Sequence, residues 1–261
     1  CKPQRQSANP NRETQGLRPA RTPRQCALMC TRYIAPDTAD IERFWHIGRH
    51  NPWRGGEMFP RSLGPFLRAT HDSTEAQCEQ TVGVWGLIPW FAKAAKLSYA
   101  TQNARFEGID TKASYKHPWQ RGQRCIVPAW SFLEPNWETG RNVWWRFARV
   151  DGEPLGLAGL WNRWADPATG EIVESYTLLT VNANAHPLMS RMHKPDPKLP
   201  PEEQDKRSVV VIERADSERW LFGAVADAAA KKSESAPVEA LHLAEAALAA
   251  DRAHRGAPAA S

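Results

Sequence analysis

The stretch Arg124–Pro135 reads RCIVPAWSFLEP, an apolar run rich in β-branched and aromatic residues that ends in an acid and a proline. Runs of this kind, bounded by turn-forming residues, are typical of β-strands. Six further stretches have the same character: GPFLRAT from residue 64, TVGVWGLIP from 81, NVWWRFARV from 142, LGLAGLW from 155, SYTLLTVNA from 175 and SVVVIE from 208. Because strands and helices do not alternate regularly, we predict an α+β fold. It is a single domain with a mostly antiparallel, barrel-like β core and flanking short helices.

Short helices are expected beside this sheet. In DTADIERFWHIG, Asp37 or Thr38 can cap the N-terminus, and Ile41, Phe44 and Trp45 form one apolar face. Further helical segments are expected within residues 92–111 and 216–222. A marginal helix is expected within residues 238–252, where few apolar side chains could anchor it.

Composition divides the chain into three regions. Residues 1–29 are rich in Arg, Pro and Gln without periodicity, which predicts a disordered basic leader or a misassigned start. Residues 30–223 contain all twelve tryptophans and the strand-like runs, so we place the folded domain there. Residues 224–261 form an Ala-rich, low-complexity tail.

The formal net charge of +5 lies in the first 29 residues, which contain six Lys or Arg and one acid. The remainder is neutral, so net charge gives no support to a nucleic-acid-binding body. No apolar run of about 18 residues is present, and the first 29 residues lack the apolar segment of a secretory signal. We therefore expect a cytoplasmic protein with no membrane partner.

The cysteines give no sign of a disulfide framework, because there are five of them at irregular spacing. Cys26 and Cys30, with His46 and His50 downstream, lack the two closely spaced ligand pairs of structural zinc sites. No phosphate-binding glycine loop occurs either. We expect neither a metal nor another cofactor.

Two short stretches place polar, reactive residues near strand ends. Cys30, with Arg32 in MCTRY, is either a nucleophile or a buried structural cysteine, which is the more usual fate of a free cysteine. Asn103 and Arg105 occur in NARFEG, where the arginine either holds a phosphate or pairs with an acid at the surface.

Three further features also leave two interpretations open. WGLIPW, residues 85–90, either packs in the core or offers aromatic faces to unstacked bases. Glu134 is either an exposed strand-end acid or a partly desolvated one, whose raised pKa would suit acid/base chemistry. His186 and His193 in NANAHPLMSRMHKP are either structural or catalytic.

The order of these motifs resembles that of the SRAP (SOS response-associated peptidase) family over residues 29–223. The shared series is Met-Cys-x-Arg-Tyr, Trp-Gly-Leu-Ile-Pro-Trp, Asn-Ala-Arg, Val-Pro-Ala-x-x-Phe-x-Glu, Gly-Leu-Trp and a histidine before a β-branched strand. The resemblance implies a catalytic set of Cys30, Asn103, Glu134 and His193. It implies DNA contacts by Arg32, Trp85, Pro89 and Arg105. His193 is preferred to His186 because the family's histidine lies just before the strand written here as RSVVVI.

The resemblance also implies an activity: a monomer that captures abasic sites in single-stranded DNA. The α-amine of Cys30 would condense with the ring-opened sugar aldehyde, and its thiol would close a thiazolidine. His193 would move a proton during ring opening, Glu134 would act as general acid/base, and Asn103 would orient the Cys30 amine. A non-covalent single-stranded DNA binder and an autoproteolytic thiol peptidase are the alternatives.

Three features depart from the family pattern. Thr31 replaces a usual glycine, and a loop is inserted between His193 and the following strand. Twenty-nine residues also precede Cys30, and an amide-bound Cys30 has no free amine. Crosslinking therefore requires a start at Met29 or cleavage before Cys30; otherwise the chain is inactive as a crosslinker.

Overall fold

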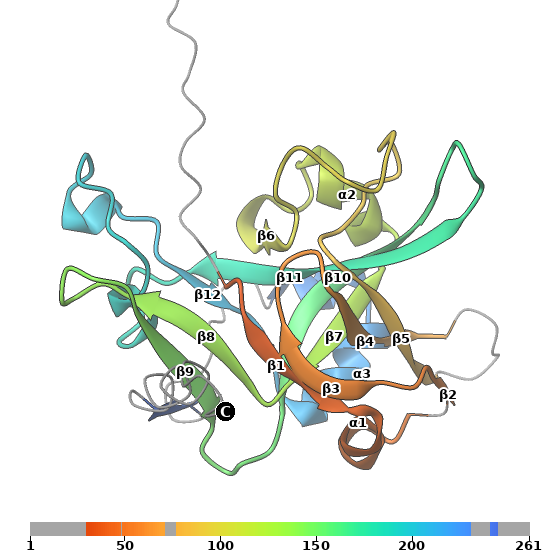
Figure 1. Cartoon of the computed structure of the whole chain (residues 1–261), viewed down its shortest axis with the longest axis horizontal. Coiled ribbons are helices and arrows are strands. Elements are labelled where there is room, and N and C mark those ends of the chain that lie inside the picture. The colour runs from red at the N-terminus through yellow and green to blue at the C-terminus, as the bar shows by residue number, and fades with distance from the viewer. Residues whose placement is uncertain (1–29, 48, 71–76, 231–240, 245–261) are drawn as a thin grey trace, which may run out of the picture.

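The computed structural model describes residues 30–47, 49–70, 77–230 and 241–244, and its strands form two sheets (Figure 1). The smaller sheet contains, in order, β14 (Leu241–Ala244), β9 (Val143–Arg149), β8 (Ser131–Asn136), β1 (Tyr33–Asp37) and β3 (Arg54–Met58). The larger sheet contains β12 (Arg207–Val209), β11 (Ile172–Asn182), β10 (Leu155–Ala165), β7 (Arg124–Ala129), β4 (Leu63–Ala69), β5 (Cys78–Trp85) and β2 (Arg49–His50). In addition, β13 (Val211–Ile212) pairs with β10, and β6 (Asn103–Arg105) pairs with β11.

The larger sheet closes on itself. Strands β11, β10, β7, β4 and β5 are neighbours in that order, and β5 pairs again with β11 through Val84–Ser175 and Trp85–Tyr176. The four other pairings around this ring are antiparallel. The predicted mostly antiparallel, barrel-like core is therefore confirmed.

The stretch RCIVPAWSFLEP forms two strands, β7 and β8, where the sequence suggested one. Trp130 separates them, and its N–H donates to Ile34 O at 2.7 Å. The chain changes sheet at this point, because β7 pairs with β4 and β10 whereas β8 pairs with β1 and β9. One short stretch thus joins the barrel to the smaller sheet.

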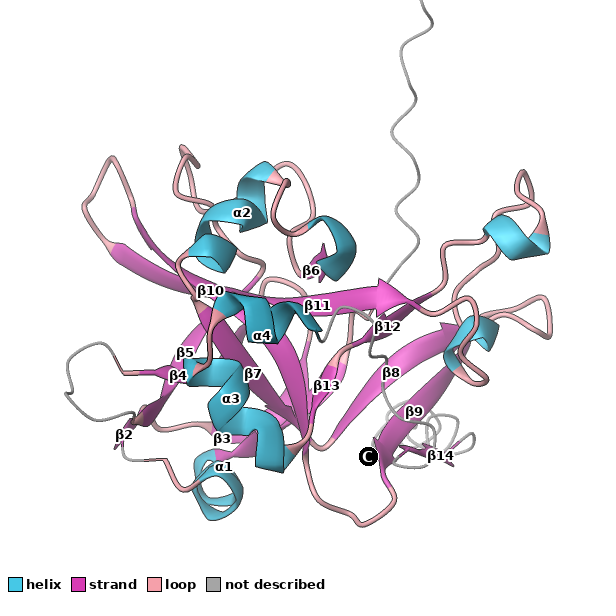
Figure 2. Ribbon diagram, turned by 180° about the vertical axis from the view of Figure 1, so that it is seen from behind, coloured by secondary structure: helices cyan, strands magenta, loops and turns pink. Residues whose placement is uncertain are grey.

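The core consists of two apolar clusters. One includes Phe66, Trp85, Cys125 and Tyr176 of the barrel strands together with Phe132 of β8. A glycine permits close packing here, since a Cβ on Gly159 would lie 2.6 Å from Thr177 O and 2.8 Å from Cys125 Sγ. The second cluster lies under the helices, and Figure 2 shows α3 (Ser217–Phe222) and α4 (Val225–Ala229) covering the strands from behind.

Two helix predictions are confirmed. The helix α1 (Thr38–Trp45) begins at Asp37, whose carboxylate accepts a hydrogen bond from Asp40 N at 2.9 Å. Ile41 on its apolar face is fully buried. The helix α3 lies within the predicted 216–222 segment.

Of the other two helix predictions, the one within residues 92–111 is met only by a short 3-10 helix at residues 106–108, and the one within 238–252 is wrong over the residues that the structure describes. Residues 103–105 form β6, because their backbone pairs in parallel with β11. The short 3-10 helix η1 (Phe106–Gly108) follows, and the neighbouring α-helix α2 begins only at Ala113 and ends at Gln120. Within the predicted 238–252 helix, the described residues form β14, which pairs with the edge strand β9; the rest of that segment lies outside the described residues.

The remaining 3-10 helices are η2 (Met189–Arg191), η3 (Pro201–Glu203) and η4 (Arg214–Asp216). Ordered structure continues past residue 223, since α4 and β14 both lie beyond it. The predicted leader, residues 1–29, lies outside the described residues. Among the helices that the structure describes, none is long and apolar enough to cross a membrane.

Candidate active site

Four residues that are far apart in the sequence meet in one buried cluster: Cys30, Asn103, Glu134 and His193. Asn103 Nδ2 donates to Cys30 O at 2.7 Å, and the Cys30 thiol interacts with the Glu134 carboxylate. Glu134 Oε2 lies 2.9 Å from His193 Nε2. No member of the cluster exposes more than 8% of its surface. The structure thus brings together the complete predicted catalytic set.

Strand β8 places Glu134 beside Cys30. Strand β1 pairs with β8 through Tyr33–Phe132 and Ile34–Ser131, and Leu133 N donates to Arg32 O at 2.9 Å. Extended past the start of β1, this antiparallel register brings the segment that contains Cys30 alongside the part of β8 that contains Glu134.

Strand β6 places Asn103. Its backbone pairs with Leu178 of β11, and its carbonyl accepts a hydrogen bond from Tyr115 Oη of α2 at 3.2 Å. With the backbone held from both sides, the amide side chain reaches Cys30. Its Oδ1 is buried without a hydrogen-bond partner among the described residues, so this acceptor is available to a bound molecule.

His193 also depends on β8 for its position. It follows η2, and its N–H donates to Pro135 O at 2.7 Å, one residue after Glu134. Its φ of +64° lies in the left-handed region, which is uncommon for residues other than glycine. The ring Nδ1 is buried and has no partner among the described residues.

Burial controls the ionisation of the pair at the centre of the cluster. The pKa of the Cys30 thiol is raised well above its usual value, first by burial and then by the charge of Glu134. Burial also raises the pKa of Glu134, while the neighbouring His193 and the Cys30 thiol act in the opposite direction. A protonated thiol beside a carboxyl group that can exchange a proton suits acid/base chemistry better than direct attack by a thiolate.

His186, the alternative histidine, has a different environment. Its Nδ1 accepts hydrogen bonds from Leu188 N and Met189 N, both at 3.1 Å. The ring therefore supports the backbone at the start of η2, whereas His193 contacts Glu134.

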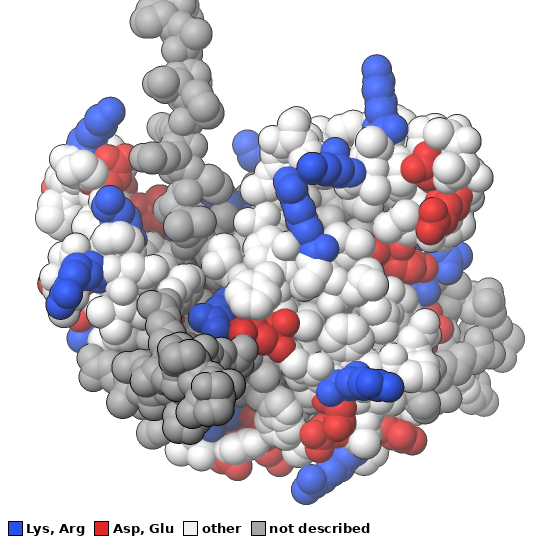
Figure 3. Space-filling view, in the orientation of Figure 1, with Lys and Arg blue, Asp and Glu red and all other residues white. Residues whose placement is uncertain are grey.

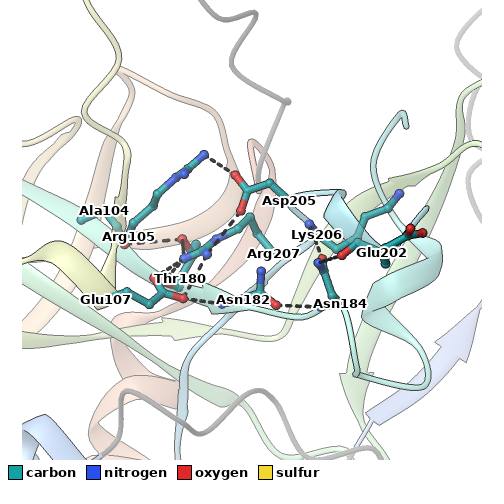
Figure 4. A network of polar contacts seen from close by, with 10 residues as sticks. All are labelled: Ala104, Arg105, Glu107, Thr180, Asn182, Asn184, Glu202, Asp205, Lys206 and Arg207. Atoms are coloured by element: carbon teal, nitrogen blue, oxygen red, sulfur yellow. Dashed lines mark hydrogen bonds and ion pairs between the residues drawn. The ribbon is translucent and has the colours of Figure 1, made fainter. Parts of the chain in front are cut away.

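The two arginines of the predicted DNA-binding set lie at the surface with acidic partners. Arg32 pairs with Glu57, and its guanidinium lies 5.5 Å from the centre of the Phe59 ring. Arg105 is half exposed and pairs with Asp205, a contact visible in Figure 4. Acidic and basic side chains both occur over the face seen in Figure 3.

Trp85 and Pro89 were predicted to contact DNA, but both are buried in the core. Trp85 has no exposed surface; its Nε1 donates to Gln102 O at 2.9 Å, and its ring meets Tyr33 edge-on at 5.0 Å. Pro89 is buried as well. Both predictions are corrected, because a side chain enclosed by the core offers no face to a base.

The exposed aromatic residue of the same motif is Trp90, with 64% of its surface accessible. It follows the buried run and packs edge-on against Phe91 at 5.7 Å. Trp90 closes the WGLIPW stretch that could offer aromatic faces to unstacked bases, but the DNA contacts implied by the family resemblance do not include it. Its position after Pro89, where the strand-like pattern ends, was the available signal.

Cys26, Cys30, His46 and His50 are of the residue types that bind zinc. Of that set, Cys26 lies outside the described residues, and His46 is an exposed residue that ends α1. Within the part of the chain that the structure describes, no three His, Cys, Asp or Glu side chains are grouped to bind a metal ion.

The sequence of this chain is similar to those of known proteins. Residues 29–249 match the family described as SOS response associated peptidase (SRAP). Abasic site processing protein HMCES of Gallus gallus is 30% identical over 168 residues, which are 52% of this chain and 48% of that protein. Abasic site processing protein YoqW of Bacillus subtilis (strain 168) is 31% identical over 123 residues, 47% and 53% of the respective chains. The matched region spans about half the length of these relatives.

Solved structures share the fold. A protein from Bordetella bronchiseptica is 32% identical, with a TM-score of 0.71, and the match covers 82% of this chain and 98% of that one. A protein from Bacteroides thetaiotaomicron, at 22% identity and a TM-score of 0.57, matches over 72% of this chain and 76% of its own, and shows the fold alone.

Proposed function

Because this chain belongs to the SRAP family, we propose that it recognises abasic sites in single-stranded DNA and captures them covalently through Cys30. The observation that carries the proposal is the buried cluster of Cys30, Asn103, Glu134 and His193. These side chains come from four separate segments and include a nucleophile, a carboxyl group and an imidazole in contact. Relatives named abasic site processing proteins support the choice of lesion.

The proposed reaction begins at the α-amine of Cys30. The amine adds to the aldehyde carbon of the ring-opened abasic sugar, and loss of one water gives an imine. The thiol sulfur then bonds to the imine carbon while the thiol proton passes to the nitrogen, which closes a five-membered thiazolidine. No oxidant or reductant is consumed, and water is the only product released.

Each member of the cluster has a role in these steps. Glu134 accepts and returns the protons that move during amine addition and loss of water, and its raised pKa suits both directions. His193, in contact with Glu134, relays a proton when the sugar ring opens. Asn103 holds the Cys30 carbonyl and so fixes the orientation of the amine.

The amine must be free for this chemistry. In the 261-residue chain Cys30 is bonded to Met29, so its nitrogen belongs to an amide. The active form that we propose therefore begins at Cys30, after removal of an initiating Met29 or after cleavage at that bond.

The DNA strand would lie along the surface near Asn103. A pocket of about 550 Å³ is lined by Arg61, Lys96 and Tyr99 together with Gln102, the residue before Asn103. The basic side chains suit phosphates, and the exposed Trp90 and Tyr99 offer faces on which bases can stack. Arg105 and Arg32 would bind phosphates in place of their acidic partners, Asp205 and Glu57.

The test compares two forms of the protein, one beginning at Cys30 and one with all 261 residues. Each is mixed with single-stranded DNA that carries one abasic site and is run on a denaturing gel, with the N-terminus verified by mass spectrometry. We expect a shifted band from the Cys30 form alone. Cys30→Ser should abolish it, whereas the matched variant Cys78→Ser, at a cysteine outside the cluster, should keep it.

The opposite result favours a second function. If the Cys30 form gives no shifted band but binds the same DNA on a native gel, the protein is a non-covalent single-stranded DNA binder. The amide-bound nitrogen of Cys30 in the 261-residue chain is the observation in favour of that alternative. Cleavage of the Met29–Cys30 bond by the purified protein itself would instead indicate the autoproteolytic thiol peptidase activity.

A further inference from the structure

We propose that Lys206 is a positioning residue that holds His193 in its left-handed backbone conformation and thereby directs the imidazole at Glu134. Lys206 Nζ donates to Met192 O at 2.6 Å and to His193 O at 2.8 Å. One ammonium group thus bridges two consecutive carbonyls at the residue that contacts Glu134. The catalytic consequence of this contact rests on the function proposed above.

The backbone of His193 is held from both sides. Its N–H is bonded to Pro135 O of β8, and its C=O accepts from Lys206. A residue with a side chain keeps a φ of +64° only where its surroundings compensate for the unfavourable conformation. The two bonds supply that compensation, and they also fix the direction in which the ring leaves the backbone.

The backbone of Lys206 is itself held by two hydrogen bonds, of which Figure 4 shows the one to Asn184. Its N–H donates to Asn184 Oδ1 at 2.9 Å, and its C=O accepts from Ala183 N at 2.8 Å. The next residue, Arg207, is held by two hydrogen bonds to Glu107, at 2.7 and 3.0 Å. Because its own backbone is fixed, Lys206 can hold the backbone of Met192 and His193 in place.

The ammonium has no acidic partner among the described residues; its acceptors there are the backbone carbonyls of Met192 and His193. Partial burial accordingly lowers the pKa of Lys206. A surface lysine usually keeps its ammonium group in water. The ammonium of Lys206 instead donates to two backbone carbonyls, which indicates that it positions them.

The contact between Lys206 and His193 joins the two ends of the inserted loop, residues 194–205. The loop is closed internally by Gln204, whose side chain accepts from Asp196 N at 2.8 Å and donates to Asp196 O at 3.0 Å and Leu199 O at 2.8 Å. Because the loop is long, the covalent chain alone does not fix the position of His193 relative to β12, the strand that follows. The hydrogen bonds from Lys206 fix that position, because they join the residue after the loop to the two residues before it.

The experiment uses the form beginning at Cys30. Lys206→Met removes the donors at similar length, Lys206→Arg retains donors, and Lys198→Met makes the same change at an exposed lysine of the same loop. The first readout is the imidazole NMR spectrum. We expect the His193 signals to move and broaden in Lys206→Met, to return toward the wild type in Lys206→Arg, and to stay unchanged in Lys198→Met. The His117 signals serve as an internal reference.

The second readout is the single-turnover rate of adduct formation, measured beside the non-covalent Kd for DNA. We expect Lys206→Met to slow the chemical step by about 10- to 100-fold with the Kd unchanged, as small misplacements of catalytic groups do. In a His193→Ala background the same substitution should cause no further loss, because Lys206 acts through His193. If Lys206→Met does not fold, Lys206→Gln, which keeps one donor group, takes its place.

Unchanged His193 signals in the folded variant would overturn the proposal, and so would an equal rate loss in the His193→Ala background. If the wild type forms no adduct, the proposed function fails, and the NMR comparison alone then decides whether Lys206 positions His193.

Discussion

Trp85 and Trp90 belong to one six-residue motif, yet their side chains have opposite surroundings. Trp85 has no exposed surface, whereas Trp90 exposes 64%. Truncating a buried tryptophan removes many apolar contacts and leaves a cavity. We therefore expect Trp85→Ala to lower the free energy of unfolding by about 3–5 kcal/mol. Urea denaturation followed by circular dichroism measures this change.

Trp90→Ala is the complementary change. It should alter the free energy of unfolding by no more than about 0.5 kcal/mol, because its ring is mostly in solvent. It should weaken binding of an oligonucleotide without an abasic site by about 1–3 kcal/mol, the value of one stacked base, as measured by fluorescence anisotropy. Unaltered DNA affinity in this variant would remove Trp90 from the binding surface.

At the scale of the element, β10 lies between β7 and β11, and Gly159 lies opposite Cys125 and Leu178. A Cβ at this position would lie 2.6 Å from Thr177 O, so the strands must shift to accept it. We expect Gly159→Ala to lower the free energy of unfolding by about 1–3 kcal/mol, as overpacking does in other cores. Thermal and urea denaturation both report this loss.

Gly108→Ala is the matched control for that strand substitution. A Cβ at Gly108 would find its nearest neighbour, Thr111 Oγ1, at 3.6 Å, an ordinary contact. This variant should be as stable as the wild type. Equal stabilities for the two alanine variants would show that β10 adjusts without cost and that the packing around Gly159 is not close.

At the scale of the whole molecule, Arg207 of β12 and Glu107 of η1 join segments 100 residues apart. Partial burial acts to raise the pKa of Glu107, but hydrogen bonds from Arg207 and from Asn182 N outweigh it and leave the pKa below its usual value of 4.5. A carboxyl group with a lowered pKa in the folded state stabilises the protein above its usual pKa. That contribution is lost as the pH falls through the lowered value.

We therefore expect Glu107→Gln to be less stable than the wild type at pH 7, with the difference shrinking as the pH falls from the usual value of 4.5 through the lowered pKa. Urea denaturation between pH 7 and pH 3 measures it. In an Arg207→Met background the pH-dependent difference should vanish, since the partner is gone. A difference that does not shrink as the pH falls would mean that the amide disturbs packing instead.

Much of the fold could be predicted from local patterns, and the exceptions have local reasons. The β-branched runs became strands, and Asp37 caps α1 as expected. Strands β1 and β3 were missed because YIAPD contains a proline and RGGEM contains two glycines, Gly55 and Gly56, which have positive φ. Residues 103–105 are a strand only because β11 lies beside them.

The sequence by itself determined which stretches are extended, where the first helix begins and which reactive residues occur in the order of the family. These properties depend on neighbours in the chain and on the identity of each side chain. Only the tertiary structure decided that Trp85 is enclosed while Trp90 is exposed, that Asn103 holds Cys30, and that Lys206 reaches His193. The reason is physical: burial and hydrogen bonding are properties of contacts between segments, and here such contacts join residues 13 to 73 positions apart.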